Sequence, residues 1–198
     1  MRKAVLERNT NETRIKLELQ LDPVSSPGQA PESGISTGIG FFDHMLNLFA
    51  FRAGVALTVE CKGDLEIDGH HTAEDVGIVL GQAIAQALGD KRGINRYGNA
   101  RLPMDECLAQ VDLDICNRPY LVFNAQFPTE KVGDFETELT EEFFRGVATH
   151  AGMTLHINLL YGKNTHHMLE AIFKAFGAAF KQAVAVTGEG IPSTKGML

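Results

Sequence analysis

A short motif of two adjacent histidines followed by a glutamate occurs twice in the sequence, 96 positions apart. Residues 70–74 read HHTAE and residues 166–170 read HHMLE. Each copy opens a segment whose apolar residues recur at helical spacing, residues 76–88 in the first case and 171–186 in the second. The repeat therefore predicts two related helices, each beginning at a histidine pair.

Within each copy, the first histidine and the glutamate are four positions apart and so share one face of a helix. The second histidine lies roughly 100° around the axis, since a helix has about 3.6 residues per turn. The first histidine and the glutamate could bind one cation, while the second histidine points in a different direction. Two such units predict two metal sites, each built from both halves of the chain.

The similarity between the halves extends beyond the histidines. Ala53-Gly54-Val55 matches Ala151-Gly152-Met153 at an offset of 98, which also places His44 on Glu142. Such self-similarity indicates an internal duplication. We expect an α+β fold with two βββαβα half-repeats, residues 1–92 and 93–198, forming one compact unit. Mixed or antiparallel sheets covered by helices are the expected layout. The halves could pack helix layer on helix layer or sheet on sheet.

Alternation, turn residues and helical spacing predict the individual elements. The predicted strands lie in residues 1–21 (two strands around a turn at 9–12), at residue 35, and at 55–61, 106–116, 120–127 and 153–160. The predicted helices are residues 40–52, 135–149 and the two His-His helices, which end near 89 and 187. Residues 22–33 are rich in proline and serine and predict a loop.

The composition excludes several classes of function. The net charge of −7 argues against nucleic acid or an anionic membrane as the partner. Apolar runs are much shorter than the roughly 18 residues that indicate a membrane span. The polar N-terminus carries no secretory signal, and three cysteines without CxxC spacing indicate reduced, buried thiols. We therefore expect a cytoplasmic protein.

Imidazole and carboxylate ligands favour borderline divalent metals, namely Mn²⁺, Fe²⁺ or a catalytic zinc with open positions. Pseudo-symmetry suggests two ligand sets. One would contain His44, His71, His166 and Glu170, and its image would contain Glu142, His167, His70 and Glu74.

A second constellation is basic. Arg96 and Arg118 lie outside the metal motifs, and Ser193-Thr194-Lys195 offers hydroxyls, backbone N–H groups and an ammonium, the groups that hold a phosphate. A metal site beside a phosphate site predicts a small phosphorylated substrate.

Seven motifs together carry a family resemblance. They are Phe42-Asp43-His44-Met45, Asp68-x-His70-His71-Thr72-x-Glu74-Asp75, Arg92-x-x-x-Arg96-Tyr97-Gly98, Pro103-Met104-Asp105-Glu106, Arg118-Pro119-Tyr120, Gly162-x-Asn164-x-His166-His167-x-x-Glu170 and Pro192-Ser193-Thr194-Lys195-Gly196. Over essentially the whole chain they resemble imidazoleglycerol-phosphate dehydratase, a family of histidine-biosynthesis enzymes.

The resemblance implies a duplicated half-domain, two Mn²⁺ per active site, and trimers that assemble into a 24-subunit shell with active sites between subunits. The implied reaction converts D-erythro-imidazoleglycerol phosphate into imidazole acetol phosphate and water. The implied metal ligands are His44, His70, His71, Glu74, His166, His167 and Glu170. The implied substrate-binding residues are Glu12, Arg96, Arg118, Ser193 and Lys195, and Thr194 lies between the last two.

One position departs from the family pattern. Many members carry His where this chain has Glu142, and a carboxylate there is also a competent Mn²⁺ ligand. Glu12 is the expected general base, with Glu74 or Glu170 as alternatives, and His71 completes the catalytic set. Two other classes stay open on the residues alone: a metal-dependent phosphoester hydrolase and a metal-storing shell protein.

Overall fold

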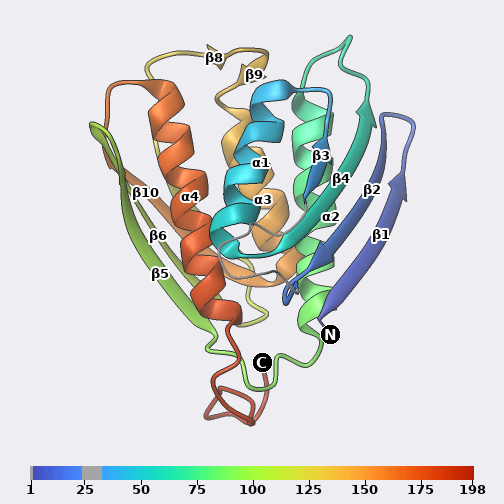
Figure 1. The fold of residues 1–198 in the computed structure, drawn as a ribbon, viewed down its shortest axis with the longest axis vertical. Coiled ribbons are helices and arrows are strands. Elements are labelled where there is room, and N and C mark those ends of the chain that lie inside the picture. Colours follow the sequence, from blue (N-terminus) through green and yellow to red (C-terminus); the bar gives the residue numbers. More distant parts are fainter. Residues whose placement is uncertain (1, 24–32) are drawn as a thin grey trace.

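The computed structural model describes residues 2–23 and 33–198, and these form two halves with the same order of elements (Figure 1). The first half contains β1 (Lys3–Asn9), β2 (Thr13–Gln20), β3 (Gly34–Ser36), α1 (Gly40–Ala53), β4 (Ala56–Gly63) and α2 (His70–Leu88). The second contains β5 (Tyr97–Met104), β6 (Cys107–Ile115), β7 (Tyr120–Asn124), α3 (Leu139–Ala151), β10 (Met153–Tyr161) and α4 (Thr165–Val184), with the small hairpin β8 (Lys131–Val132) and β9 (Phe135–Glu136) inserted before α3. The predicted βββαβα duplication is confirmed.

Each half has a four-stranded mixed sheet, and the two sheets match strand for strand. Their orders are β1-β2-β4-β3 and β5-β6-β10-β7, and the last pair in each order is parallel. The pairing register repeats as well, because Glu18 opposite Thr58 corresponds to Asp112 opposite His156. A duplicated sequence has thus produced two sheets with the same side-chain directions, since a one-residue slip would reverse every face.

The four helices lie between the two sheets, which form the outer layers (Figure 1). Helix α2 packs on β1 and β2, α4 packs on β5 and β6, and the halves meet through the pairs α1–α4 and α2–α3. The core between them is strongly aromatic: Phe49 stacks on Phe176, and Phe143 stacks on Phe173. Of the two arrangements expected for the halves, the structure has the one in which helix layer packs on helix layer.

Equivalent glycines end α1 and α3. Gly54 has φ 70° and ψ 32°, and Gly152 has φ 65° and ψ 39°. Both are in the left-handed region, where glycine avoids the steric cost of a Cβ atom. The matched Ala-Gly pairs seen in the sequence are the two C-terminal caps that turn the chain from a helix into β4 or β10.

Several predicted boundaries are wrong. The third helix begins at Leu139 rather than 135, because Phe135–Glu136 pairs with Lys131–Val132 as strand β9. Strand β7 ends at Asn124 rather than 127, and α4 ends at Val184 rather than near 187. Strand β5 had no predicted counterpart at its own position. Most of the predicted loop at 22–33 lies outside the described residues.

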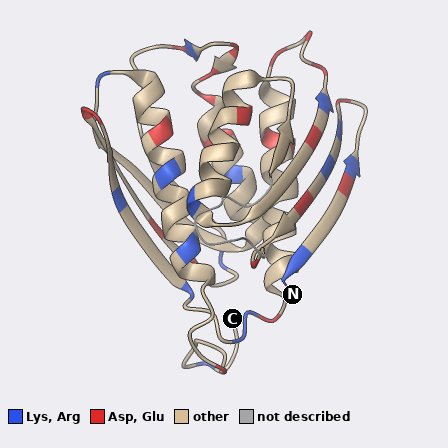
Figure 2. Ribbon diagram, in the orientation of Figure 1, with Lys and Arg blue, Asp and Glu red and all other residues tan. Residues whose placement is uncertain are grey.

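Charged residues of both signs are distributed over the strands of the outer sheets (Figure 2). Lys3 and Glu18, for example, form an ion pair of 2.5 Å across β1 and β2. In the described part of the chain, no helix combines the length and apolar character needed to cross a membrane. The three cysteines are unpaired, as predicted, but Cys61 is only partly buried, and burial raises its pKa to about 11.

Candidate metal centre

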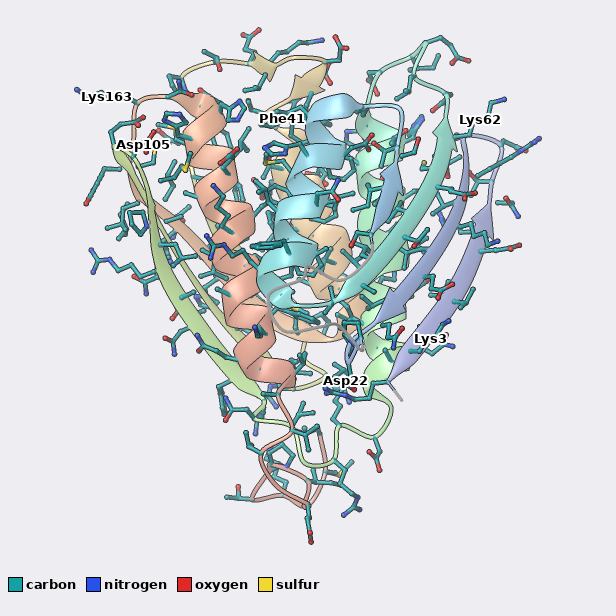
Figure 3. The ribbon with its side chains drawn as sticks, in the orientation of Figure 1. Lys3, Asp22, Phe41, Lys62, Asp105 and Lys163 are labelled. Carbon is teal, nitrogen blue, oxygen red and sulfur yellow. The ribbon has the colours of Figure 1, made fainter. Side chains whose placement is uncertain are left out.

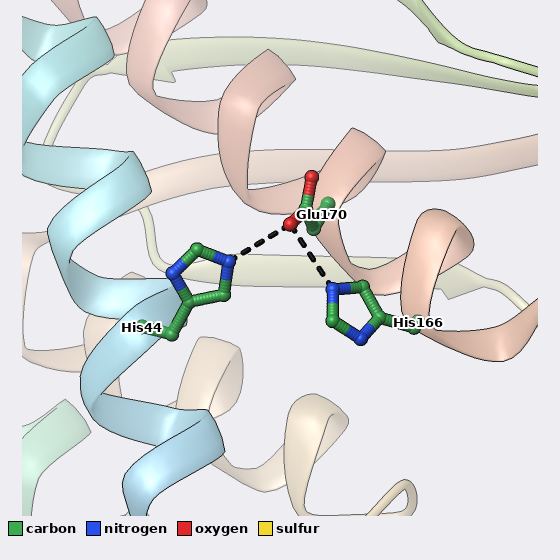
Figure 4. Close-up of side chains that lie close together, drawn as sticks. All are labelled: His44, His166 and Glu170. Carbon is green, nitrogen blue, oxygen red and sulfur yellow. Dashed lines mark hydrogen bonds and ion pairs between the residues drawn. The ribbon is translucent and has the colours of Figure 1, made fainter.

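Three of the predicted ligands meet near the N-terminal ends of α1 and α4 (Figure 4). His44 Nε2 lies 2.8 Å from Glu170 Oε1, and His166 Nε2 lies 3.1 Å from the same oxygen. One ligand atom from each residue falls within 4.8 Å of the others. His44 arrives from the first half, while His166 and Glu170 arrive from the second, so the centre is built across the duplication.

The carboxylate of Glu170 is the buried element of this group, at 7% exposure. Its second oxygen accepts a hydrogen bond of 2.5 Å from Lys174 Nζ, one helical turn further along α4. Burial raises the pKa of Glu170, but the hydrogen bonds from Lys174, His44 and His166 more than offset this and lower it to about 2. The group therefore holds an ionised carboxylate between two imidazole rings.

An aromatic ring packs against the imidazoles. Phe41, one turn before His44 on α1, has its ring centroid 5.0 Å from that of His166 and 6.4 Å from that of His44. Edge-to-face arrangements of this kind are favourable contacts between aromatic rings. Phe41 therefore packs against both of the rings whose nitrogen atoms face Glu170.

The second predicted ligand set, which contains His70, Glu74, Glu142 and His167, does not form a comparable group. His70 Nε2 lies 3.9 Å from Glu74 Oε2, as expected for positions i and i+4. Glu142, however, turns along its own helix to Arg145, with Oε2 3.4 Å from Nε. Among the described residues, only His44, His166 and Glu170 form a group in which one potential ligand atom from each residue lies within 4.8 Å of the others. The residues predicted for the second site therefore do not come together among the described residues of this one chain.

The second histidine of each pair points away from these groups, as helical spacing predicts. The structure therefore separates His71 from His44, His166 and Glu170, with which it was grouped. His71 Nδ1 lies 3.0 Å from Asp64 Oδ2, and its Nε2 lies 3.7 Å from Glu12 Oε1. The hydrogen bond to Asp64 raises the pKa of His71.

His167 has a parallel environment in the second half. Its Nδ1 lies 2.9 Å from Glu106 Oε2, and its Nε2 lies 3.7 Å from Asp105 Oδ2. The hydrogen bond to Glu106 raises the pKa of His167. The pKa of Glu106 is lowered, mainly because the backbone N–H of Asn164 donates to it and because His167 does so as well.

The basic residues predicted to bind phosphate belong to segments at the opposite end of the molecule, where β5 begins and the C-terminal tail lies (Figure 1). Arg96 contacts Asp114 through Nε and Nη2 at 2.7 and 3.0 Å, and its Nη1 donates to the carbonyl of Pro192 at 3.0 Å. Arg118 Nη2 lies 3.6 Å from the same Asp114, with its side chain largely exposed. Arg96 thus fastens the tail just before Ser193.

Sequence reasoning missed several residues that touch the predicted ligands, among them Lys174, Asp64 and Glu106. Lys174 was detectable, since it lies four positions after Glu170 and shares its helical face. Glu106 was detectable through the duplication, because the register of the two sheets maps Glu12 onto it. Asp64 has no counterpart in the other half, where Gly162 stands at the equivalent position, and no signal pointed to it.

Comparison with known proteins gives a consistent result. Residues 37–180 match the family model for imidazoleglycerol-phosphate dehydratase. The protein of that name from Acetivibrio thermocellus is 58% identical over 100% of this chain and 99% of its own length, and the one from Streptococcus mutans is 55% identical over both full lengths.

Solved structures agree with the sequence relatives. The crystal structure of imidazoleglycerol-phosphate dehydratase from Staphylococcus aureus superposes with a TM-score of 0.82 at 46% identity, covering 93% of this chain and 99% of that one. The Pyrococcus furiosus enzyme also gives 0.82, at 36% identity, covering 98% and 100%. The relatives carry the name of a hydro-lyase, an enzyme that removes water. With its duplicated fold, its paired histidines and these relatives, the chain belongs to the imidazoleglycerol-phosphate dehydratase family.

Proposed function

We propose that this protein is a cytoplasmic, metal-dependent hydro-lyase of histidine biosynthesis that converts D-erythro-imidazoleglycerol phosphate into imidazole acetol phosphate. The observation that carries the proposal is the meeting of His44, His166 and Glu170 at one carboxylate oxygen, in a chain of this family. The name of the relatives supports the substrate and the reaction.

The donor set fits a divalent transition metal. Two imidazole nitrogens and an ionised carboxylate suit Mn²⁺ or a metal of similar hardness, and none of the cysteines belongs to the group. We assign two Mn²⁺ to each active site. The full set of ligands comprises His44, His70, His71, Glu74, Glu142, His166, His167 and Glu170.

When bound, the metals would supply Lewis acidity that draws charge onto the imidazole ring of the substrate. That ring must accept electrons because the carbon that loses its proton has no carbonyl group beside it. The hydroxyl leaves from the carbon next to the ring, the middle carbon loses its proton, and the resulting enol becomes the ketone of the product. One C–H and one C–O bond break, and one water is released.

Glu12 is the best placed of the three candidate bases. Its carboxylate is about half exposed and lies 3.7 Å from His71 Nε2. Both oxygens of Glu170 are already engaged, by the two histidines and by Lys174, so it is poorly placed to take up a proton. Glu74 faces His70 at 3.9 Å and is assigned to a metal. A solvent-accessible carboxylate beside a proposed metal ligand suits general base catalysis.

The phosphate would be held by Arg96, Arg118, Ser193, Thr194 and Lys195. Asp114 keeps both guanidinium groups near the tail, and the contact of Arg96 with Pro192 brings the three tail residues into the same region. Such a clamp would hold the reacting carbon of the substrate next to the general base. Correct positioning of the reacting atoms contributes to the rate.

The two parts of the site lie too far apart to serve one substrate within a single chain. The backbone N–H of Arg96 donates to Ala183, near the end of α4, whereas His166 lies at its start. Seventeen residues at about 1.5 Å each give roughly 25 Å between these ends. The three-carbon chain of the substrate is far shorter, at roughly 1.5 Å per bond. We therefore propose that the metal groups of one copy meet the phosphate clamp of another, in trimers that assemble into a 24-subunit shell.

The test begins with protein stripped by a chelator and then supplied with Mn²⁺ and imidazoleglycerol phosphate, with product followed by absorbance. We expect no turnover without metal and recovery after Mn²⁺ is added. Release of inorganic phosphate would indicate a hydrolase instead. Stoichiometric metal uptake with no turnover would indicate storage.

A pair of matched variants sharpens the test. His166→Ala removes one ligand of the group, and we expect it to lower Mn²⁺ content and turnover together. His156→Ala removes an exposed histidine of β10 outside the metal motifs, and we expect both quantities to stay near those of the wild type. Equal behaviour of the two variants would contradict the assignment.

A further inference from the structure

The second histidine of each pair has a carboxylate directly behind its ring. Asp64 contacts Nδ1 of His71 at 3.0 and 3.2 Å, and Glu106 contacts Nδ1 of His167 at 2.9 Å. In both cases the contact is to Nδ1, although the two carboxylates come from different places in the fold. Asp64 follows strand β4, whereas Glu106 lies in the two-residue turn between β5 and β6. The same contact has therefore been reached twice by different residues.

This contact decides which ring nitrogen is free. An ionised carboxylate can only accept hydrogen bonds, so Nδ1 must carry the hydrogen that it receives. In a neutral imidazole the other nitrogen, Nε2, then has an unshared electron pair. Only such a nitrogen can bind a metal ion. The carboxylates thus select the tautomer in which Nε2 of His71 and His167 is available.

Glu106 is itself held rigidly. Its Oε1 accepts the backbone N–H of Asn164 at 2.7 Å and that of Lys163 at 3.2 Å, immediately before α4. Asn164 in turn caps α4, since its side chain accepts the N–H of His167 at 3.3 Å. Figure 3 shows Asp105, the neighbour of Glu106, and Lys163 at the end of the molecule where Phe41 lies in the first turn of α1. The ring of His167 is therefore located by the hairpin, the loop and the helix at once.

Asp64 is fixed in a different way. Its backbone N–H donates to the carbonyl of Glu12 at 3.1 Å, and its own carbonyl accepts the N–H of Ile67 at 2.9 Å. The same short turn thus carries the carboxylate behind His71 and ties it to the residue that faces the front of that ring. Glu12 and Asp64 face different nitrogen atoms of this one imidazole, Nε2 at 3.7 Å and Nδ1 at 3.0 Å.

We propose that Asp64 and Glu106 are positioning residues that act through His71 and His167, holding each ring with Nε2 directed outward to a metal ion. The inference rests on the proposed function, because it takes these histidines to be ligands. Carboxylates placed behind metal-binding histidines orient the ring and raise its basicity, and their loss commonly weakens metal affinity 10- to 100-fold.

The experiment measures Mn²⁺ binding to chelator-stripped full-length protein by the EPR signal of free Mn²⁺. The variants are Asp64→Asn and Glu106→Gln, which keep the size of the side chain and remove the charge. Glu18→Gln is the matched control. It removes the same charge from the outer sheet, where Glu18 pairs with Lys3. Thermal unfolding of each metal-free protein is measured in parallel.

We expect Asp64→Asn and Glu106→Gln each to weaken the binding of part of the Mn²⁺ by about 10- to 100-fold, while Glu18→Gln binds as the wild type does. Restoring the acid with Asp64→Glu or Glu106→Asp should recover part of the affinity, which a merely structural role would not require. Affinities within twofold of wild type in both variants, with metal-free proteins that remain folded, would overturn this inference and leave the proposed function intact. A wild-type protein that takes up no Mn²⁺ would overturn both.

Discussion

The packing of the two helix layers can be tested by adding a single methyl group. Gly177 on α4 faces α1 so closely that a Cβ atom there would lie 2.7 Å from the carbonyl oxygen of Phe49, 2.8 Å from Cβ of Arg52 and 3.1 Å from the backbone nitrogen of Ala53. None of these atoms can be moved by rotating a side chain. Gly177→Ala must therefore push α1 and α4 apart.

The size of the effect follows from two opposing terms. Overpacking in a well-packed interior costs typically about 1–3 kcal/mol, and contacts with backbone atoms belong at the upper end. Replacing glycine by alanine inside a helix returns about 1 kcal/mol. The net loss is therefore about 2 kcal/mol, which corresponds to a fall of about 4–8 °C in Tm for a chain of this length.

The duplication supplies a second, independent measurement of the same quantity. Gly81 on α2 meets α3 in the same manner, with a Cβ atom 2.7 Å from the oxygen of Val147, 2.9 Å from Cβ of His150 and 3.0 Å from the nitrogen of Ala151. Gly81→Ala should cost about as much as Gly177→Ala. Gly40→Ala, at the start of α1 where a Cβ atom meets nothing within 4 Å, is the control and should leave Tm unchanged or slightly raised.

The assay is thermal and urea unfolding of the metal-free proteins, followed by circular dichroism. If Gly177→Ala unfolds at or above the temperature of the wild type, the close approach of the helices is refuted. A large cost at only one of the two glycines would refute the equivalence of the two interfaces. Because α1 carries His44 and α4 carries Glu170, we also expect Gly177→Ala to weaken Mn²⁺ binding.

Three further predictions concern the site and its supports. Asp75 is buried and accepts hydrogen bonds from Thr13 Oγ1 at 2.5 Å and Arg8 Nη2 at 2.9 Å, so Asp75→Asn should lower the free energy of unfolding by about 1–3 kcal/mol in urea titrations; an unchanged midpoint would contradict this. Lys195→Ala should raise KM about 10- to 100-fold, through loss of a charged hydrogen bond to phosphate, while metal content stays constant; lost metal would show that the two parts of the site are not separate. Glu142→Gln should lower the amount of bound Mn²⁺ without removing it, measured by elemental analysis, and full occupancy would exclude Glu142 as a ligand.

Much of the fold follows from local patterns in the sequence. The helical spacing after each histidine pair, the Ala-Gly caps and the alternation in residues 14–21 and 106–116 depend on contacts between residues that are close in the chain. The duplication then predicted the order of elements in the second half from that in the first. The i, i+4 spacing also predicted that each glutamate lies beside the first histidine of its pair and that the second histidine points elsewhere.

Tertiary structure alone decided which elements oppose one another. Helical periodicity determines the residues that share a face but not the helix that this face meets, so His44 joins His166 and Glu170 while His71 turns to Asp64. The start of α3 was likewise decided by pairing with another strand.

The separation of the candidate metal group from the proposed phosphate clamp is also a property of the folded chain. The sequence places Arg96 far from both histidine pairs without saying how far apart they lie in space. The distance follows from the length of α4, because His166 lies at one end of this helix and Arg96 is hydrogen-bonded to the other end. Local patterns determined the two half-repeats and the residue types of the candidate ligands. Long-range packing decided which candidate ligands meet, because contacts between helices and sheets join residues that no short stretch of sequence contains.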